Sequence, residues 1–379
     1  MVKAKETDNM KTKRFKVIAA MVRRMLPLAL VLGGVVIAAP EAAGDNGPVS
    51  ALIKALEVGR PVAYRSLSIV PIYRFDRPKP KGFADLGEAV KNGWVEITEI
   101  EGGRVPQVRI SNLSSRILFL MGGEILTGAK QDRILAADVL LAPGTKNLVA
   151  SVFCVEHGRW TAVTPAFTTK GNIGTFELRA KAMEKSGGAQ SEIWDRVAEQ
   201  NDRVGAASPT GAYQDAYERP ENKAKIEEIE KKMSAIPRLM TDTIGVVIGL
   251  AGKVVSVDIF ADPEMFRVQW PKILRSSALS ALTDRPDIGL PQSAAADFLK
   301  DLASKSYLVK KALDMGTEYS CLDATVNAQA LVLDRDVIHL AAFAQDGDKA
   351  VVGDGPEQRL RVIRDENVRS ARSIDRGIR

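Results

Sequence analysis

The chain has 379 residues, of which 45% are apolar and 26% charged. These proportions are typical of a globular protein with a sizeable core, and they exclude a disordered chain and a multispanning membrane protein. The formal net charge is +6, but residues 1–24 alone carry +6 and residues 356–379 carry +3, which leaves −3 for the stretch between them. A basic surface for nucleic acid is therefore not expected.

Two cysteines and two histidines limit the metal chemistry of the chain. A closed zinc site draws four ligands from these residue types, so Cys154, His157, Cys321 and His339 would all have to converge. No CxxC or HExxH motif is present. We therefore expect no metal ligands here, and the sequence identifies no cofactor. The cysteines form either a disulfide or two buried free thiols.

The amino-terminal segment has the layout of a signal peptide. Basic residues precede an apolar run of 15 residues at 25–39, and Pro40 follows it. This run is shorter than the ~20 apolar residues that cross a bilayer as a helix. We expect residues 1–39 to direct export, so that the protein is periplasmic or secreted. The alternative is an uncleaved segment that anchors the chain to the membrane.

The first half of the chain is predicted to be rich in strands. Residues 49–57 have helical spacing, and residues 62–73 alternate as in a strand. Asp85 and Glu88 have the spacing of a helix start, and Gly93 ends that helix. Further strands are predicted at 94–100, 107–112, 116–121, 133–141 and 147–155.

From about residue 177 onward, helical spacing becomes more frequent. Helices are predicted at 177–185, 191–204 and 221–236, with a loop at 206–220. A hairpin of two strands, 244–250 and 253–260, follows and turns at Ala251 and Gly252. The remaining elements are helices at 262–270, 271–282 and 294–301 and strands at 318–328, 330–333 and 337–343.

Strands and helices come in blocks rather than in strict alternation. This order favours an α+β fold with a largely antiparallel β-sheet core, a helical insertion and flanking helices. We expect one domain over 49–345 and a basic flexible tail at 356–379. The parts of the domain are a β-rich section at 61–170, a helical section at 177–237, a hairpin with helices at 244–310 and terminal strands at 318–343.

The densest group of functional side chains lies at 122–133, between two predicted strands. Its glycines allow close approach of a ligand to the backbone. Glu124, Lys130, Gln131 and Arg133 add opposite charges and an amide, which suits an anionic or amide ligand. The alternative is a charged hairpin in which Glu124 pairs with Lys130 or Arg133.

A second group, Cys154 to Trp160, ends an apolar strand. Strand alternation places Cys154 and Glu156 on one face and His157 and Arg159 on the other. This separation disfavours a nucleophile pair of Cys154 and His157, and the alternative is a core cysteine beside a solvated histidine. Glu156 is a candidate acid or base.

Several strings of the sequence resemble one family. They are residues 123–135, 151–160, 208–211, 244–247, 252–260 and 272–276. Together they resemble the ADP-ribosylglycohydrolase and rhodanese-phosphatase associated protein domain family over roughly residues 49–343. The family is named for the genes that occur near its own, so the resemblance implies a link to ADP-ribose chemistry without assigning a reaction.

The resemblance also implies that the two groups of functional side chains share one site. Basic and amide side chains would bind the ligand, and acidic side chains or the thiol would act in catalysis. The ligand-binding candidates are Lys130, Gln131, Arg133, Arg159 and Trp160. The catalytic candidates are Glu124 and Glu156 as general base and Cys154 as nucleophile.

We therefore expect an exported domain that binds a small anionic ligand such as a nucleotide or an ADP-ribose derivative, whether or not it is an enzyme. The alternative is a non-enzymatic envelope structural or protein-interaction module. A ligand site requires the charges of Glu124, Lys130, Arg133 and Glu156 to line a concave surface, whereas the alternative requires them to be paired or spread over a flat face. No nucleic-acid partner is expected, and the membrane is contacted only through an uncleaved amino-terminal segment.

Overall fold

A computed structural model describes residues 43–345 apart from short gaps. The gaps are 45–46, 77, 101–105, 160, 185–188, 207, 237–240 and 284. The predicted signal segment, the basic tail and the ligand candidate Trp160 therefore lie outside the described residues. No helix among those described is long and apolar enough to cross a membrane.

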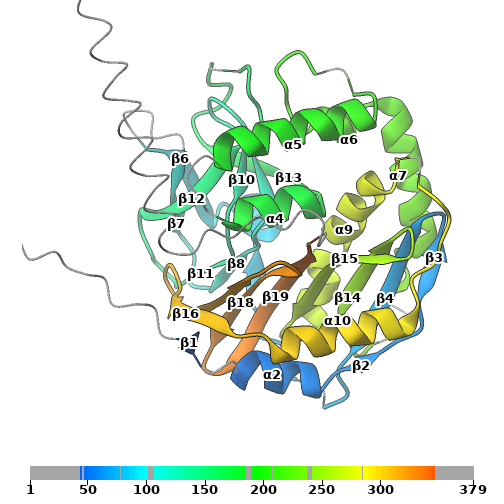
Figure 1. Cartoon of the computed structure of the whole chain (residues 1–379). Coiled ribbons are helices and arrows are strands. Elements are labelled where there is room, and N and C mark those ends of the chain that lie inside the picture. Colours follow the sequence, from blue (N-terminus) through cyan, green and yellow to red (C-terminus); the bar gives the residue numbers. More distant parts are fainter. Residues whose placement is uncertain are drawn as a thin grey trace, which may run out of the picture. The chain divides into compact units, whose positions relative to one another are not determined.

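The largest sheet has ten strands, all paired antiparallel (Figure 1). Its order is β1-β16-β17-β18-β19-β15-β14-β4-β2, and β3 also pairs with β4. The strands are β1 Ala43–Gly44, β2 Glu57–Val58, β3 Val62–Tyr64, β4 Leu67–Tyr73, β14 Thr243–Leu250, β15 Lys253–Phe260, β16 Tyr307–Lys311, β17 Thr317–Leu322, β18 Val326–Leu333 and β19 Asp336–Ala344.

Both faces of this sheet are covered, which explains why its central strands are apolar throughout. In β4, Val70 belongs to one apolar core and Ile69 to another, because successive side chains of a strand point to opposite faces. Two helices pack on each face (Figure 1). One face carries α2 (Gly47–Lys54) and α10 (Gln292–Ser304), and the other carries α4 (Phe176–Glu184) and α9 (Pro263–Ser280).

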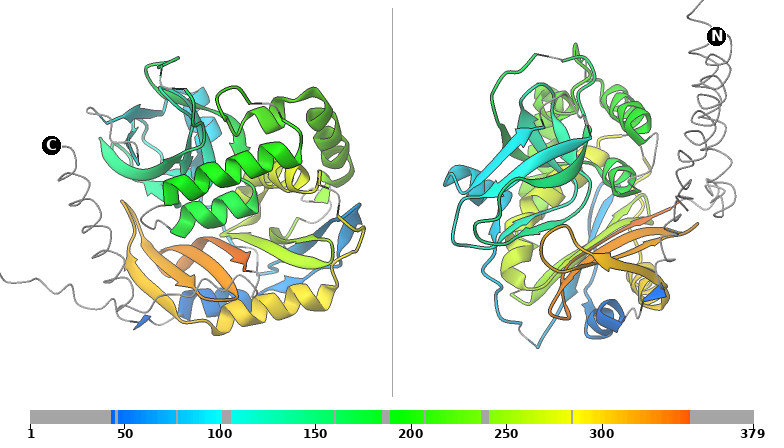
Figure 2. Two further views of the ribbon diagram at one scale, coloured as in Figure 1. Left: turned by 45° about the horizontal axis from the view of Figure 1, so that its top comes forward. Right: turned by 90° about the vertical axis from the view of Figure 1, so that its left-hand side faces the viewer.

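Two smaller sheets lie on the opposite side of the large sheet from α2 and α10 (Figure 2). One has six antiparallel strands in the order β13-β9-β10-β12-β7-β6, and the other has the order β11-β8-β5, with β5 and β8 parallel. Their strands are β5 Ala84–Asp85, β6 Val95–Glu99, β7 Gln107–Asn112, β8 Leu118–Leu120, β9 Glu124–Gly128, β10 Arg133–Leu135, β11 Val139–Leu141, β12 Leu148–Cys154 and β13 Phe167–Ile173.

The remaining helices join these layers. They are α3 (Leu86–Lys91), α5 (Ala189–Arg203), α6 (Asp215–Glu218) and α7 (Pro220–Met233). α5 packs against β12, and α7 packs against α9. The structure combines helices with largely antiparallel sheets, and the predicted α+β fold is confirmed.

Two local predictions from turn and capping residues are also confirmed. The Asp85 side chain accepts a hydrogen bond from the Glu88 backbone N–H and begins α3. The hairpin of β14 and β15 turns at Ala251 and Gly252, whose φ angles of 50° and 79° suit a two-residue hairpin turn. Both signals depend on residues that are close in sequence, so the tertiary structure does not change them.

Three predicted strands are each two strands. Residues 62–73 turn at Arg65, which has a φ of 53°, and form the hairpin of β3 and β4. Residues 133–141 leave the six-stranded sheet after β10 and enter the three-stranded sheet as β11. Residues 318–328 turn between β17 and β18. No glycine or proline marks these turns, so the sequence pattern does not reveal them.

Conversely, the helices predicted at 262–270 and 271–282 are one helix, α9, with Pro271 inside it. Proline removes one backbone hydrogen bond from a helix interior, but α9 is buried against β13, β14 and α7, and this packing holds it together. The prediction missed β13 and β16 because both are partly polar. It also missed α6, which lies within the predicted loop at 206–220.

Candidate functional site

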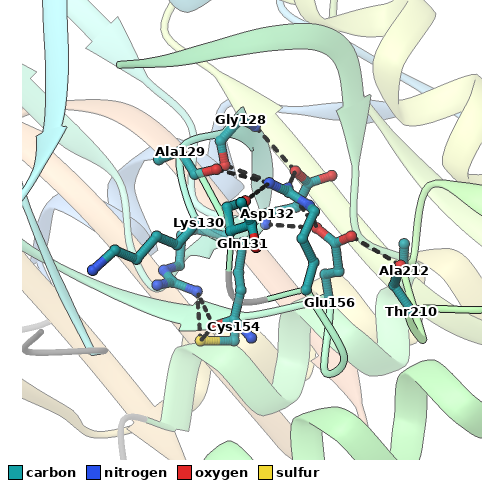
Figure 3. Close-up of polar contacts among 12 residues, drawn as sticks. Gly128, Ala129, Lys130, Gln131, Asp132, Cys154, Glu156, Thr210 and Ala212 are labelled. Carbon is teal, nitrogen blue, oxygen red and sulfur yellow. Dashed lines mark hydrogen bonds and ion pairs between the residues drawn. The ribbon is translucent and has the colours of Figure 1, made fainter. Parts of the chain in front are cut away.

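The hairpin of β9 and β10 and the neighbouring strand β12 bring three candidate residues together. Arg133 lies opposite Cys154 in the antiparallel register. The Arg133 guanidinium donates to Gln131 Oε1 at 3.0 Å and to Cys154 Sγ, and the thiol lies 3.3 Å from Gln131 Oε1 (Figure 3). Glu99 of β6 lies 3.6 Å from the same guanidinium. Arg133 is thus engaged within the protein.

The Cys154 thiol is poorly suited to nucleophilic attack. Burial raises its pKa to about 11, and this outweighs the opposing effect of Arg133. The thiol is therefore protonated at neutral pH, whereas the thiolate is the reactive form. Burial also raises the pKa of Cys321 to about 11, and both cysteines are free, so the disulfide alternative is wrong.

The second group is organised around the guanidinium of Arg159. It lies 2.5 Å from Glu156 Oε2 and 3.0 Å from Asp132 Oδ1, and it donates to the Ala129 carbonyl at 2.7 Å. The other Glu156 oxygen accepts from Thr210 Oγ1 at 2.9 Å (Figure 3). Burial acts to raise the pKa of Glu156, but the bonds from Arg159 and Thr210 hold it below its ordinary value. Glu156 is therefore a charged, fully engaged carboxylate.

Strand alternation does not extend beyond Cys154, where β12 ends. The prediction that Glu156 and Arg159 face opposite sides is therefore wrong, because the two form an ion pair. The His157 ring meets the ring of Trp194 edge to face, with centroids 4.4 Å apart. Lys130 is exposed, and its backbone N–H donates to Glu99 at 3.3 Å.

Glu124 lies in a different group of contacts, between β9 and α9. Lys272 Nζ lies 2.5 Å from Glu124 Oε1 and 2.7 Å from Asp85 Oδ2. Burial acts to lower the pKa of Lys272, but these two carboxylates raise it, so the ammonium stays charged. The alternative that Glu124 pairs with Lys130 or Arg133 is therefore wrong, because its partner is Lys272. The candidate residues are distributed over three contact groups, and their role in ligand binding stays a prediction.

The sequence analysis missed a second buried network, next to that of Lys272. Arg179 of α4 lies 2.6 Å from Asp258 Oδ1, which lies 3.2 Å from His339 Nε2. His339 Nδ1 lies 2.7 Å from Asp138 Oδ2. Burial acts to lower the pKa of His339, but the two carboxylates raise it to about 9. Spacing offers no signal for this network, because each residue comes from a different part of the chain.

The largest of the described cavities is a cleft of about 820 Å³ between α4, α5 and the hairpin of β14 and β15. Cationic side chains outnumber acidic ones in its wall. The cationic side chains are Lys181, Arg196, Arg203, Lys253 and Arg285, and the acidic ones are Glu177, Glu184 and Glu192. The candidate residues from the sequence analysis do not line this cleft.

A metal site is not formed within the described part of the chain, where no three His, Cys, Asp or Glu side chains are placed to hold an ion. The buried charged side chains Glu156, Asp258 and Glu124 are each paired with a cation of the chain. The described side chains offer hydrogen bonding, charge complementarity and acid–base action.

Comparison with known proteins identifies the family of this chain. Residues 55–343 match the model of the ARG and Rhodanese-Phosphatase-superfamily-associated Protein domain, ARPP-1. The chain belongs to the ARPP-1 family. Searches of curated proteins and of solved structures found no significant match. The ARPP-1 match contains both buried charge networks and nearly all of the cleft.

Two strings that carried the resemblance meet inside this ARPP-1 domain. Glu124 belongs to the first string and Lys272 to the last, and their side chains form the ion pair between β9 and α9. The available signal was Lys272 on the buried stripe of α9, next to Ile273, because a buried lysine requires a carboxylate partner. The sequence did not show which carboxylate it would be.

Proposed function

We propose that this ARPP-1 domain binds a small anionic ligand in the cleft between α4, α5 and the β14–β15 hairpin. The observation that carries the proposal is the surplus of five cationic over three acidic side chains around a cavity of about 820 Å³. This volume is in the usual range for a small-molecule site. We place the ligand in the cleft rather than at the 122–133 segment, since Glu124, Asp132 and Arg133 of that segment are paired with other side chains.

The surplus of positive charge in the cleft comes from two residues. Lys181, Arg203 and Arg285 each lie against a glutamate of the cleft wall. Arg196 and Lys253 form no ion pair with any residue that the structure describes. Their side chains are therefore available for phosphate or carboxylate oxygens.

A nucleotide or an ADP-ribose derivative fits the rest of the cleft. The Glu177 carboxylate in the wall of the cleft offers an acceptor for a ribose hydroxyl. Phe176, Leu250 and Val254 supply apolar surface for a base. The family name, which refers to ARG, supports this class by association alone.

The test is a thermal-shift and calorimetric titration of the full chain with ADP-ribose, AMP, ribose 5-phosphate and inorganic phosphate. A ligand at 100 times its Kd adds about 2.7 kcal/mol to the free energy of unfolding, which is visible as a higher Tm. We expect R196Q and K253Q each to weaken binding about tenfold, which corresponds to one charge-assisted hydrogen bond. The matched control is K300Q, an exposed lysine of α10. Equal binding by all four proteins would contradict the proposed location.

We also propose that the protein is exported by its amino-terminal segment. The support is the basic stretch followed by the apolar run at 25–39. Amino-terminal sequencing of the protein after cell fractionation is expected to find a new terminus near residue 40 in the periplasmic or secreted fraction. An intact terminus in the membrane fraction would instead support the anchored form.

The second candidate function is a non-enzymatic structural or interaction module. The observation that favours it is the pairing of Glu124, Arg133 and Glu156 inside the fold, since a module of this kind requires no free charges at those positions. Absence of any ligand response in the titrations, together with loss of stability on changing these residues, would favour this module over the ligand-binding domain.

A further inference from the structure

Lys272, Glu124 and Asp85 bring one amine and two carboxylates together inside the fold. Lys272 and Glu124 are 8% and 2% exposed, and the Asp85 side chain is 12% exposed. Lys272 Nζ lies 2.7 Å from Asp85 Oδ2 and 2.5 Å from Glu124 Oε1. Buried ions have lost the hydration that stabilises them in the unfolded chain. A reaction that consumes one amine and one carboxylate together is therefore favoured by this environment.

The Lys272 amine and the Asp85 carboxyl carbon are placed to react with each other. The 2.7 Å contact and a C–O bond of about 1.23 Å put Nζ within about 4 Å of Asp85 Cγ. Groups that the fold holds so close react as if at a very high concentration. The other oxygen, Oδ1, accepts from the Glu88 backbone N–H at 2.8 Å. This bond polarises the carbonyl and leaves Oδ2 as the departing oxygen.

Glu124 is placed to move the protons of this reaction. Its 2.5 Å contact with Lys272 Nζ is within the reach of a general base. Burial raises the pKa of Glu124 and acts to lower that of Lys272, so both effects favour transfer of a proton from the ammonium to Glu124. The two carboxylates act in the opposite direction on Lys272. The charged amine is therefore the resting form, and the neutral amine is the minor, reactive form.

A cavity of about 270 Å³ beside Asp85 provides an exit for water. Its wall contains Asp85 together with the apolar side chains of Phe83, Phe119 and Met265. The volume is that of several water molecules at ~30 Å³ each. A water molecule formed at Asp85 therefore has space to leave the site.

We propose that Lys272 and Asp85 condense to a side-chain amide bond, with Glu124 as the proton carrier. Glu124 takes a proton from the Lys272 ammonium, and the freed electron pair of Nζ forms the bond to Asp85 Cγ. The electron pair of the Cγ–Oδ2 bond leaves with Oδ2. Two of the three ammonium protons depart with this oxygen as water, one of them through Glu124, and the third stays on the amide nitrogen. Glu124 ends in its starting form, and the condensation requires no oxidant or reductant.

The bond joins α9 to the residue that begins α3, 187 positions away in the sequence. It replaces two buried charges with one neutral amide. Glu124 thereby acts as the general base that the sequence analysis expected, but on the protein itself. This modification is independent of the ligand proposed for the cleft.

The test is mass spectrometry of the purified full chain, whose amino terminus is first established by sequencing. We expect an intact mass that is lower than the calculated mass by one water molecule. Trypsin does not cut after an acylated lysine, so it should release residues 82–91 joined to residues 268–275. A mass equal to the calculated one, or a lower mass without the joined peptide, would overturn the proposal.

Two variants identify the reacting groups. K272R keeps the positive charge but lacks the amine, and E124Q removes the proton carrier at nearly constant shape. We expect both at their calculated masses, without the joined peptide. The matched controls are K300R, at an exposed lysine of α10, and E264Q, at an exposed glutamate of α9, and both should be joined like the wild type.

The wild-type measurement decides the proposal even if a variant does not fold. Complete joining in E124Q would overturn the assignment of Glu124 as the proton carrier.

Discussion

At the scale of single residues, Arg133 and Arg159 form hydrogen bonds and ion pairs within the protein near the β9–β10 hairpin. Each guanidinium is shared among several acceptors of the chain, and Arg133 is 4% exposed. Such side chains fix neighbouring backbone segments relative to one another, because a planar guanidinium bonds in several directions at once. Substitution of either arginine is therefore expected to lower the free energy of unfolding.

R133A is expected to lower the free energy of unfolding by about 1–3 kcal/mol, because it leaves Glu99 and Gln131 without a charged hydrogen-bond donor. Urea denaturation of the variant and of R109A, a half-exposed arginine of β7, measures the difference. Loss of ligand binding at unchanged stability would restore Arg133 as a binding residue.

Cys154 is expected to resist alkylation in the folded protein, because its thiol is buried and its pKa is raised to about 11. Iodoacetamide at pH 7.5, followed by mass spectrometry, should label Cys154 only after denaturation. Rapid labelling of the native protein would reopen the hypothesis of a Cys154 nucleophile.

At the scale of elements, α9 is the helix on which the layers converge. It packs against β13 of the six-stranded sheet and against β14 and β15 of the ten-stranded sheet. Lys272 projects from it to Glu124 and Asp85, which belong to the two smaller sheets. The ion pairs thus specify how the helix is seated, while the apolar contacts supply most of the stability.

K272M is expected to destabilise the protein by about 3–5 kcal/mol, because two buried carboxylates lose their counterion. Addition of E124Q to K272M should recover part of this loss, since it removes one of the two unpaired charges. Chemical denaturation of the wild type, both single variants and the double variant measures the coupling. Strictly additive losses would contradict the ion pair.

At the scale of the whole molecule, His339 ties the largest sheet to the three-stranded one. It lies on β19, contacts Asp258 on β15, and reaches Asp138 just before β11. Its ring also stacks on Phe260, with centroids 4.4 Å apart. The contact between the two sheets therefore depends on the protonation of the buried His339 imidazole.

Stability is expected to fall as the pH rises from about 6.5 to about 9. The pKa of His339 is raised from 6.5 to about 9 in the folded state. A raised pKa contributes stability that is fully present below the unfolded value and is lost as the pH passes the folded value, here up to about 3 kcal/mol. Denaturation at pH 6.5, 8 and 9 tests this, and H339Q should flatten the dependence. An equal slope in H339Q would assign the effect to other groups.

The candidate site was predictable only in part. The sequence analysis placed Gln131 and Arg133 in one group and Cys154 in a second, and the resemblance implied that the groups meet. These three side chains do lie together. Glu124 was also placed in the first group, whereas its side chain points to Lys272. Arg133 lies opposite Leu126 in the hairpin, and the partner of Glu124 comes from α9, 148 residues further along the chain, where sequence spacing gives no signal.

By itself, the sequence determined the features that depend on near neighbours: the α+β order of blocks, the start of α3 at Asp85 and the hairpin at Ala251 and Gly252. These depend on backbone conformation and capping within a few residues. Tertiary structure alone decided the partners of the buried charges and the shape of the cavities. Lys272 contacts residues 148 and 187 positions away, and at such separations only the packing of the layers selects which charges meet.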